Sequence, residues 1–240
     1  LELTGLIEDV PQFSTHISEE TAPHGTYVMF FTPYVKEGAV TEGEALAKIE
    51  AARGLMNALE GMNATYQHVY SREAVFPDGQ QSVASVSVQN PGAFPRPFRD
   101  PERLARVTAG LNALELDVRT RVLLALRWFD KAERETEPID AFLKMWFALE
   151  TLAMPDTTDI RPINYAMAEV YGIEKADATE RFKIGRVFGV RGDIVHKGIV
   201  RSIHQQLQRY LQAVFVDVLF HVTSQQTEMR AEEVLADATF

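Results

Sequence analysis

The hydrophobic and polar positions change their spacing about a hundred residues into the chain. In the first part, short runs rich in β-branched and aromatic residues are typical of strands, and these runs fall at residues 26–35, 64–76 and 82–88. A helix with apolar positions on one face is predicted between Thr41 and Gly61. We therefore expect residues 1–98 to form a small α+β module with an antiparallel sheet, of unknown role.

Prolines at positions 91, 95, 97 and 101 are typical of a linker, and beyond them apolar residues recur every three or four positions. This spacing predicts helices at residues 104–115, 119–135, 139–154, 162–171 and from Asp177 onward, with an interruption at Gly189. A capping box of Ser202 and Gln205 opens the last long helix, which reaches Val222. The fold class is thus predicted as α+β, with the small α+β module followed by an all-α helical bundle over residues 101–240.

Composition limits the classes of protein to which the chain can belong. Its 240 residues are 46% hydrophobic and 24% charged, as in an ordinary soluble globular protein with a sizeable core. The net charge of −10 argues against a basic surface that grips long DNA. Cysteine is absent, which excludes disulfides and thiolate sites and fits a reducing cytoplasm, where we expect the protein. No apolar run is long enough to cross a bilayer, and the start at Leu1 suggests a piece of a larger parent protein.

Basic residues concentrate in one short segment of this acidic chain. Residues 181–201 carry six cations and a single acid, whereas the rest of the chain has 33 acids against 18 basic residues. The six cations are Arg181, Lys183, Arg186, Arg191, Lys197 and Arg201. Arg191 supplies a permanently charged fork for a phosphate, and His196 exchanges protons near neutral pH. The segment therefore predicts a site for a phosphate-bearing ligand.

The same pair also has a purely structural interpretation. His196 would then cap the end of a helix, and Arg191 would pair with Asp193 or Glu180. On a straight helix, a separation of five residues places two side chains roughly 140° apart around the axis. We therefore expect a bend or an end of the helix at the glycines that follow Arg191 and His196, or a second copy of the chain, to complete a shared cleft.

Two further carboxylates lie in apolar helical runs, where an unpaired charge would be costly. Glu150 belongs either to an active cleft or to a structural ion pair with Arg127 or Arg121. Asp217 is interpreted as half of a structural ion pair.

Aromatic residues in the same runs also allow two interpretations. The side chains of Trp128, Trp146 and Phe147 fit base stacking on a nucleic acid, but their helical spacing favours the core. The other histidines form no metal-ligand pattern, and no nucleotide-binding loop or nucleophile elbow occurs in the sequence. We therefore expect neither a metal nor another cofactor.

Three segments of the second part resemble HEPN domains and, within that superfamily, the Apea-like family. Residues 125–132 (ALRWFDKA) resemble the family's helix with Leu-Arg and an aromatic pair. Residues 142–152 (FLKMWFALETL) resemble its next helix, which ends in Ala-Leu-Glu-x-Leu. Residues 191–198 (RGDIVHKG) resemble its Arg-x4-6-His signature. The resemblance covers about residues 101–225, in the family's order and spacing.

This resemblance implies a metal-independent endoribonuclease of a bacterial anti-phage defence or toxin–antitoxin system, which acts on RNA as a homodimer. His196 would be the general base or acid and Arg191 would hold the phosphate, with Asp193 and Glu150 in support. An antitoxin would be a further partner. The residues expected to bind RNA are Arg186, Lys197, Arg201 and Lys183.

One position departs from the pattern of the family. Many active members carry asparagine, aspartate or histidine directly after the arginine, where this chain has Gly192. The alternative interpretation is therefore a non-catalytic module of the same fold, which binds RNA or a protein and works through dimerisation.

Overall fold

The computed structural model describes residues 42–60, 68–69, 72–75, 81–84, 88–89, 101–199, 202–227 and 230–236. Within these ranges the chain forms nine helices: α1 (Glu42–Glu60), α2 (Pro101–Ala113), α3 (Leu116–Glu133), α4 (Pro138–Ala153), α5 (Arg161–Tyr171), α6 (Lys175–Phe182), α7 (Ile184–Lys197), α8 (Gln205–Val222) and α9 (Arg230–Leu235). The same ranges contain four short strands: β1 (His68–Val69), β2 (Arg72–Val75), β3 (Gln81–Ala84) and β4 (Val88–Gln89).

The strands form two separate antiparallel pairs and not one sheet. β1 pairs with β4, and β2 pairs with β3. Pairs of such short strands offer no broad sheet face on which a core can be built. Where the burial of side chains is described, the hydrophobic core is built by the helices and their connecting turns. The predicted α+β class is therefore wrong, and the part of the structure that builds the core is all-helical. The strand expected at residues 26–35 lies outside the described residues.

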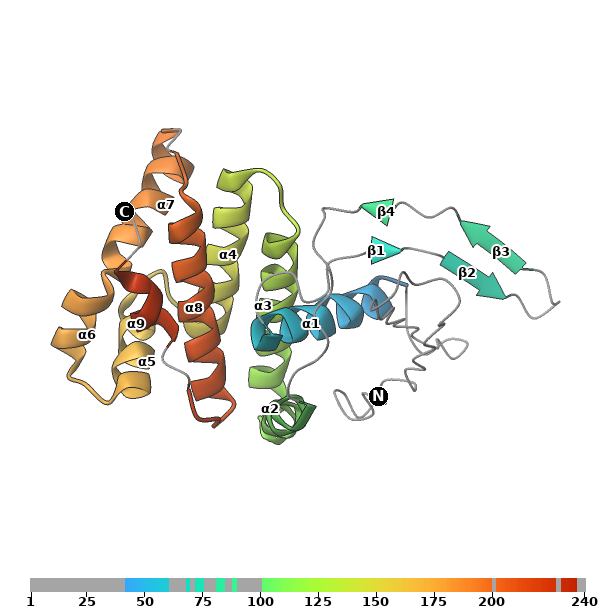
Figure 1. The fold of residues 1–240 in the computed structure, drawn as a ribbon, viewed down its shortest axis with the longest axis horizontal. Coiled ribbons are helices and arrows are strands. Elements are labelled where there is room, and N and C mark those ends of the chain that lie inside the picture. Colours follow the sequence, from blue (N-terminus) through green and yellow to red (C-terminus); the bar gives the residue numbers. More distant parts are fainter. Residues whose placement is uncertain are drawn as a thin grey trace.

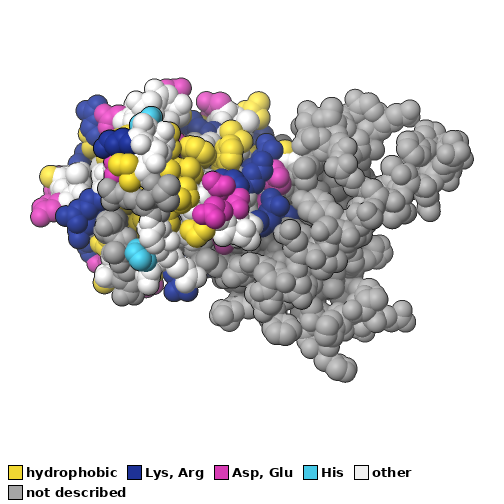
Figure 2. All heavy atoms as spheres, turned by 90° about the horizontal axis from the view of Figure 1, so that it is seen from above, with side chains coloured by type: hydrophobic (Ala, Val, Ile, Leu, Met, Phe, Trp, Pro, Cys, Tyr) yellow, Lys and Arg dark blue, Asp and Glu magenta, His cyan; other side chains and the backbone are white. Residues whose placement is uncertain are grey.

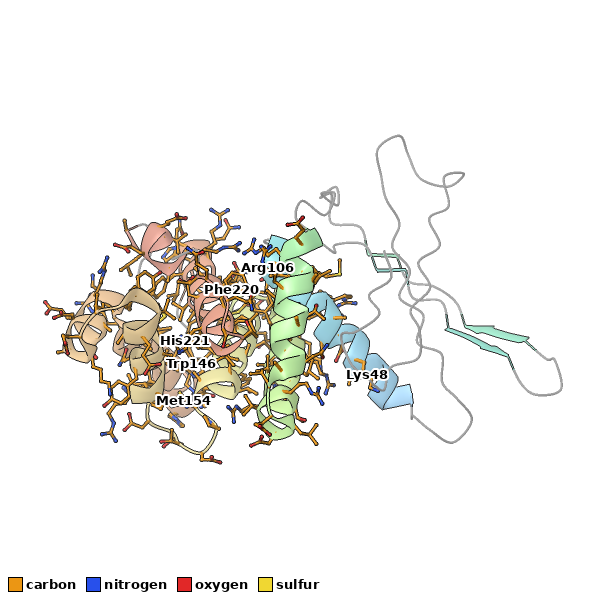
Figure 3. All side chains as sticks on the ribbon, turned by 90° about the horizontal axis from the view of Figure 1, so that it is seen from below. Lys48, Arg106, Trp146, Met154, Phe220 and His221 are labelled. Carbon is orange, nitrogen blue, oxygen red and sulfur yellow. The ribbon has the colours of Figure 1, made fainter. Side chains whose placement is uncertain are left out.

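The predicted helical bundle is confirmed. The helices α1 to α5 and α8 begin and end within three residues of the bounds expected from the apolar spacing. α3, α4 and α8 lie side by side at the centre of the described part, and the other helices pack around them (Figure 1). Phe129 of α3 stacks on Phe215 of α8, with ring centroids 4.6 Å apart. Trp146 of α4 is fully buried among the packed helices, so its interpretation as a core residue is confirmed (Figure 3).

α1 packs closely on α3, although the proline-rich stretch separates the two helices in the sequence. Small side chains on α1 make this possible, because Ala51 and Ala58 are buried beside Gly54. A Cβ atom added at Gly54 would lie 2.0 Å from the carbonyl oxygen of Leu126, which is closer than any side chain is tolerated. Leu55 of the same helix is fully buried. α1 therefore shares the hydrophobic core of the bundle.

The break between α6 and α7 falls at Lys183 and not at Gly189, where the sequence predicted it. Lys183 adopts a left-handed backbone conformation with φ of 52°, and Gly189 continues the helix. The preceding Phe182 is fully buried, and its carbonyl oxygen accepts a hydrogen bond from the buried hydroxyl of Tyr210 on α8. Tertiary packing thus fixes the end of α6, and a cationic residue occupies a position that favours glycine. α7 runs without interruption through Gly192, so no bend forms there.

The beginning of α8 also differs from the prediction. His204 is the N-cap residue, and its side chain makes no capping hydrogen bond, so the capping box of Ser202 and Gln205 does not form. Asp217, in the middle of α8, is fully buried. It binds the start of α9, and not the cationic partner that the sequence analysis expected. Its carboxylate accepts hydrogen bonds from the backbone N–H groups of Arg230 and Ala231.

The same carboxylate accepts further hydrogen bonds from two hydroxyl groups. The hydroxyl of Tyr171 on α5 lies 2.7 Å away, and that of Thr227 lies 2.8 Å away. These donors, together with the N-terminus of α9, compensate a negative charge that would otherwise be costly in the core. Asp217 is therefore a structural anchor that joins α5, α8 and α9.

Candidate functional site

Arg191 and His196 contact one another on the exposed side of α7. Nη1 of Arg191 lies 3.0 Å from Nε2 of His196, within hydrogen-bonding distance. The helix does not bend to bring them together, so the long arginine side chain bridges the angle that separates two positions five residues apart. Apart from its chain neighbours, nothing lies within 4 Å of the place where a Cβ of Gly192 would stand. The two side chains thus meet without the bend, or the second copy of the chain, that the sequence analysis expected.

This contact limits the hydrogen-bonding role that Nε2 of His196 can take. A guanidinium group only donates hydrogen bonds, so a hydrogen bond between the two requires Nε2 of His196 to accept it. A basic Nε2 on a solvent-exposed imidazole is the form that a general base requires.

Glu150 of α4 forms the second contact of Arg191. Its Oε1 lies 3.7 Å from Nη2 of Arg191, and the two side chains are 25% and 19% exposed. Of the alternatives that the sequence left open, the structure places Glu150 beside Arg191 and gives Arg127 another partner, Glu50. The guanidinium is therefore held between a carboxylate and an imidazole, in a position that still reaches the surface.

Asp193 lies one helical turn from Lys197 and forms an ion pair with it. The two groups are 2.8 Å apart, and the Asp193 side chain is only 15% exposed. Asp193 is not the ion-pair partner that the structure gives to Arg191, which is Glu150. Asp193 thus lies on the same helix as His196, but its ion pair is with Lys197.

The basic segment does not form one cluster. Lys183 and Arg186 lie at the beginning of α7, whereas His196 and Lys197 lie at its end, about 15 Å or more away along a helix of this rise. Arg181 forms an ion pair with Glu232 of α9. Arg201 lies outside the described residues. Of the cations predicted to bind RNA, Lys197 is the one that the described structure places next to the pair.

Two exposed apolar residues near the pair were missed by the sequence analysis. Val195 and Ile199 are 45% and 43% exposed, one beside His196 and one after Gly198, which ends α7 with φ of 64°. Apolar residues in the last turn of a helix, next to a histidine and a lysine, were the available signal. Phe188, one turn before Arg191, lies 5.8 Å from the buried ring of Trp146, so this contact connects α7 to the core.

The described residues contain no group of three or more histidine, aspartate or glutamate side chains arranged to hold a metal ion. Among them, no helix has both the length and the apolar character needed to cross a membrane. Comparisons of the chain with protein-family models, curated proteins and solved structures found no match. The resemblance to HEPN domains therefore remains a prediction from the sequence.

Proposed function

We propose that the protein is a metal-independent endoribonuclease in which His196 and Arg191 act on one phosphodiester. The observation that carries this proposal is the 3.0 Å contact between a guanidinium and Nε2 of an exposed imidazole. This contact places a permanent cation and a proton acceptor within reach of the same small group.

In the proposed reaction, Nε2 of His196 accepts the proton of a ribose 2′-hydroxyl. The freed oxygen attacks the adjacent phosphorus, and the bond from phosphorus to the 5′-oxygen breaks. The leaving oxygen takes up a proton, which gives a cyclic phosphate and a 5′-hydroxyl. The guanidinium of Arg191 leaves His196 and contacts the phosphate. There it stabilises the negative charge that builds on the phosphate oxygens. Glu150 keeps the guanidinium in position through its contact with Nη2.

The other elements of the proposal rest on the resemblance to HEPN domains. Lys197, Arg186, Lys183 and Arg201 would contact the RNA on either side of the cut bond. A homodimer would bring two Arg191–His196 pairs to one cleft, and the protein would act in bacterial anti-phage defence or under the control of an antitoxin.

The test is cleavage of a mixed RNA by the full chain in the presence of EDTA. We expect cyclic phosphate products from the parent protein and a loss of rate of about a hundredfold or more for His196→Ala, because general acid–base catalysis contributes about that much. Arg191→Ala should also lose activity. The matched control is His204→Ala, since His204 is an exposed histidine at the start of α8, outside the pair. Equal rates for His196→Ala and the parent would remove His196 from the mechanism.

A second candidate function is a non-catalytic binding module. It is favoured by the exposed Val195 and Ile199 at the end of α7, because exposed apolar side chains can be covered by a protein partner. In that case, the parent would not cleave RNA, and Val195→Ser would reduce self-association measured by solution mass. Cleavage by a monomer would contradict this second candidate.

A further inference from the structure

A second group of cations lies on α3, away from the basic segment that the sequence analysis identified. Arg127, Lys131 and Arg134 occur at intervals of four and three residues, so they lie on one face of the helix. All three surround the carboxylate of Glu50 on α1, at 3.1, 3.7 and 3.7 Å. The side chains of the cations are 31%, 36% and 31% exposed, whereas that of Glu50 is 8% exposed.

The nearby Asp130 is a second counter-charge for this group, but it is also bound by a further arginine. Its carboxylate is fully buried and accepts two hydrogen bonds from Nη2 of Arg53, at 2.6 and 2.7 Å. Nη2 of Arg134 also lies 2.7 Å from it, so Asp130 is shared between two arginines. Among the described residues, Glu50 and Asp130 are thus the carboxylates paired with this group of cations, which comprises Arg127, Lys131, Arg134 and Arg53, so the cations outnumber the acids within the group.

Aromatic side chains border the same cations. Nζ of Lys131 lies 5.4 Å from the ring of Trp128, which is partly exposed, and Phe147 of α4 meets that ring edge to face at 5.6 Å. Seen from above, Lys and Arg side chains, with Asp and Glu side chains among them, lie next to hydrophobic surface at the border with the residues that are not described (Figure 2). Cations beside a supported indole ring are the combination that single-stranded nucleic acids need, because the cations follow the phosphates and the ring stacks on a base.

We propose that the α3 surface formed by Arg127, Trp128, Lys131 and Arg134 binds single-stranded RNA at a site distinct from the Arg191–His196 pair. The phosphates contact the exposed guanidinium and ammonium groups, and one base stacks on Trp128. The aromatic ring distinguishes this ligand from an acidic peptide, which would need the cations alone. The site holds RNA whether or not His196 cleaves it, so the proposal goes beyond the proposed nuclease activity.

The experiment measures binding of a fluorescent 2′-O-methyl oligouridine to the full chain, because this probe lacks the nucleophile for cleavage. We expect Lys131→Gln to weaken binding several-fold and to reduce the salt dependence by about 0.7 in the slope of log K against log salt, the value for one phosphate contact on a single strand. Trp128→Leu should weaken binding about tenfold through the loss of stacking. Thermal unfolding of both variants checks that the bundle is intact.

Two control variants test whether binding takes place at the α3 surface. Lys175→Gln removes a cation on α6, which lies against Tyr165 and outside the α3 surface, so it should bind like the parent. His204→Ala, at an exposed histidine outside the pair, should also bind like the parent. Because the probe cannot be cleaved, this binding result is independent of the failure or success of the nuclease. The proposal is overturned if folded Lys131→Gln and Trp128→Leu bind the probe as the parent does. Equal competition by polyglutamate, with no effect of Trp128→Leu, would show a general anion surface and overturn it as well.

Discussion

Glu133, at the end of α3, shows how one carboxyl group can control stability. Its Oε2 is buried and has no hydrogen-bond partner among the described residues, while Oε1 accepts a hydrogen bond from the amide of Gln212 on α8. Burial is the main cause that raises the pKa of this carboxyl to about 7; the hydrogen bond from Gln212 opposes the shift, and the nearby Asp130 adds to it. At neutral pH the side chain is therefore partly protonated.

This shift gives a prediction with a defined sign. Because the pKa of Glu133 is higher in the folded state than its ordinary value of 4.5, the folded state loses stability as pH rises from about 4.5 to about 7. Glu133→Gln removes the titration, so the variant should gain stability over the parent by up to about 3 kcal/mol at pH 8 and little at pH 4. Urea unfolding at both pH values measures this difference. Glu137→Gln is the control, because Glu137 is exposed. The prediction is contradicted if Glu133→Gln changes the free energy of unfolding, relative to the parent, by the same amount at both pH values.

Residue types identified the Arg191–His196 pair, but not its contacts. Arg191 and His196 were identified from their chemistry and spacing, and the sequence also offered Glu150 as a candidate for the same cleft. The geometry of the pair depends on the rotamer of a long arginine side chain, which no sequence pattern fixes. The cations around Glu50 were missed for a different reason: Arg127 lies 77 residues from Glu50, and only the packing of α1 on α3 brings them together.

At the scale of elements, the apolar spacing predicted where helices occur, and it failed where tertiary packing decides. The helices α2 to α5 lie within a few residues of their predicted bounds because an apolar stripe of sufficient length has few alternatives. The break at Lys183 had no signal, since lysine does not favour a left-handed conformation. α9 was not predicted, because a six-residue helix held by a distant aspartate has too short a pattern.

Glycines inside two helices should respond in opposite ways to the same substitution. Gly54 of α1 faces the backbone of α3, so Gly54→Ala should destabilise the protein by about 2 kcal/mol or more through overpacking. Gly189 of α7 is exposed and has open space, so Gly189→Ala should stabilise it by about 0.5–1 kcal/mol through higher helix propensity. Denaturant unfolding of both variants gives the two signs. Stabilisation by Gly54→Ala would show that α1 and α3 are not in close contact.

At the scale of the whole molecule, the question is whether the helices after the proline-rich stretch form an independent unit. The sequence separates residues 1–98 from 101–240 by composition, and composition carries no information on which helices share a core. In the structure, α1 buries Leu55, Ala58 and Leu59 in the same hydrophobic core as α3 and α8. α1 also supplies Arg53, whose guanidinium binds the fully buried Asp130.

A chain that begins at residue 101 should therefore be much less stable than one that begins at residue 42. Removing α1 exposes the apolar face of α3, and it takes away Arg53 from a buried carboxylate, a change that typically costs about 3–5 kcal/mol by itself. Thermal unfolding followed by circular dichroism compares the two chains, and the chain from residue 42 is the control for removal of the preceding residues. A cooperative transition of the shorter chain at the same temperature would show that the bundle folds alone. A loss of cooperativity would place α1 within the folding unit, so that the boundary predicted from composition would lie inside a single core.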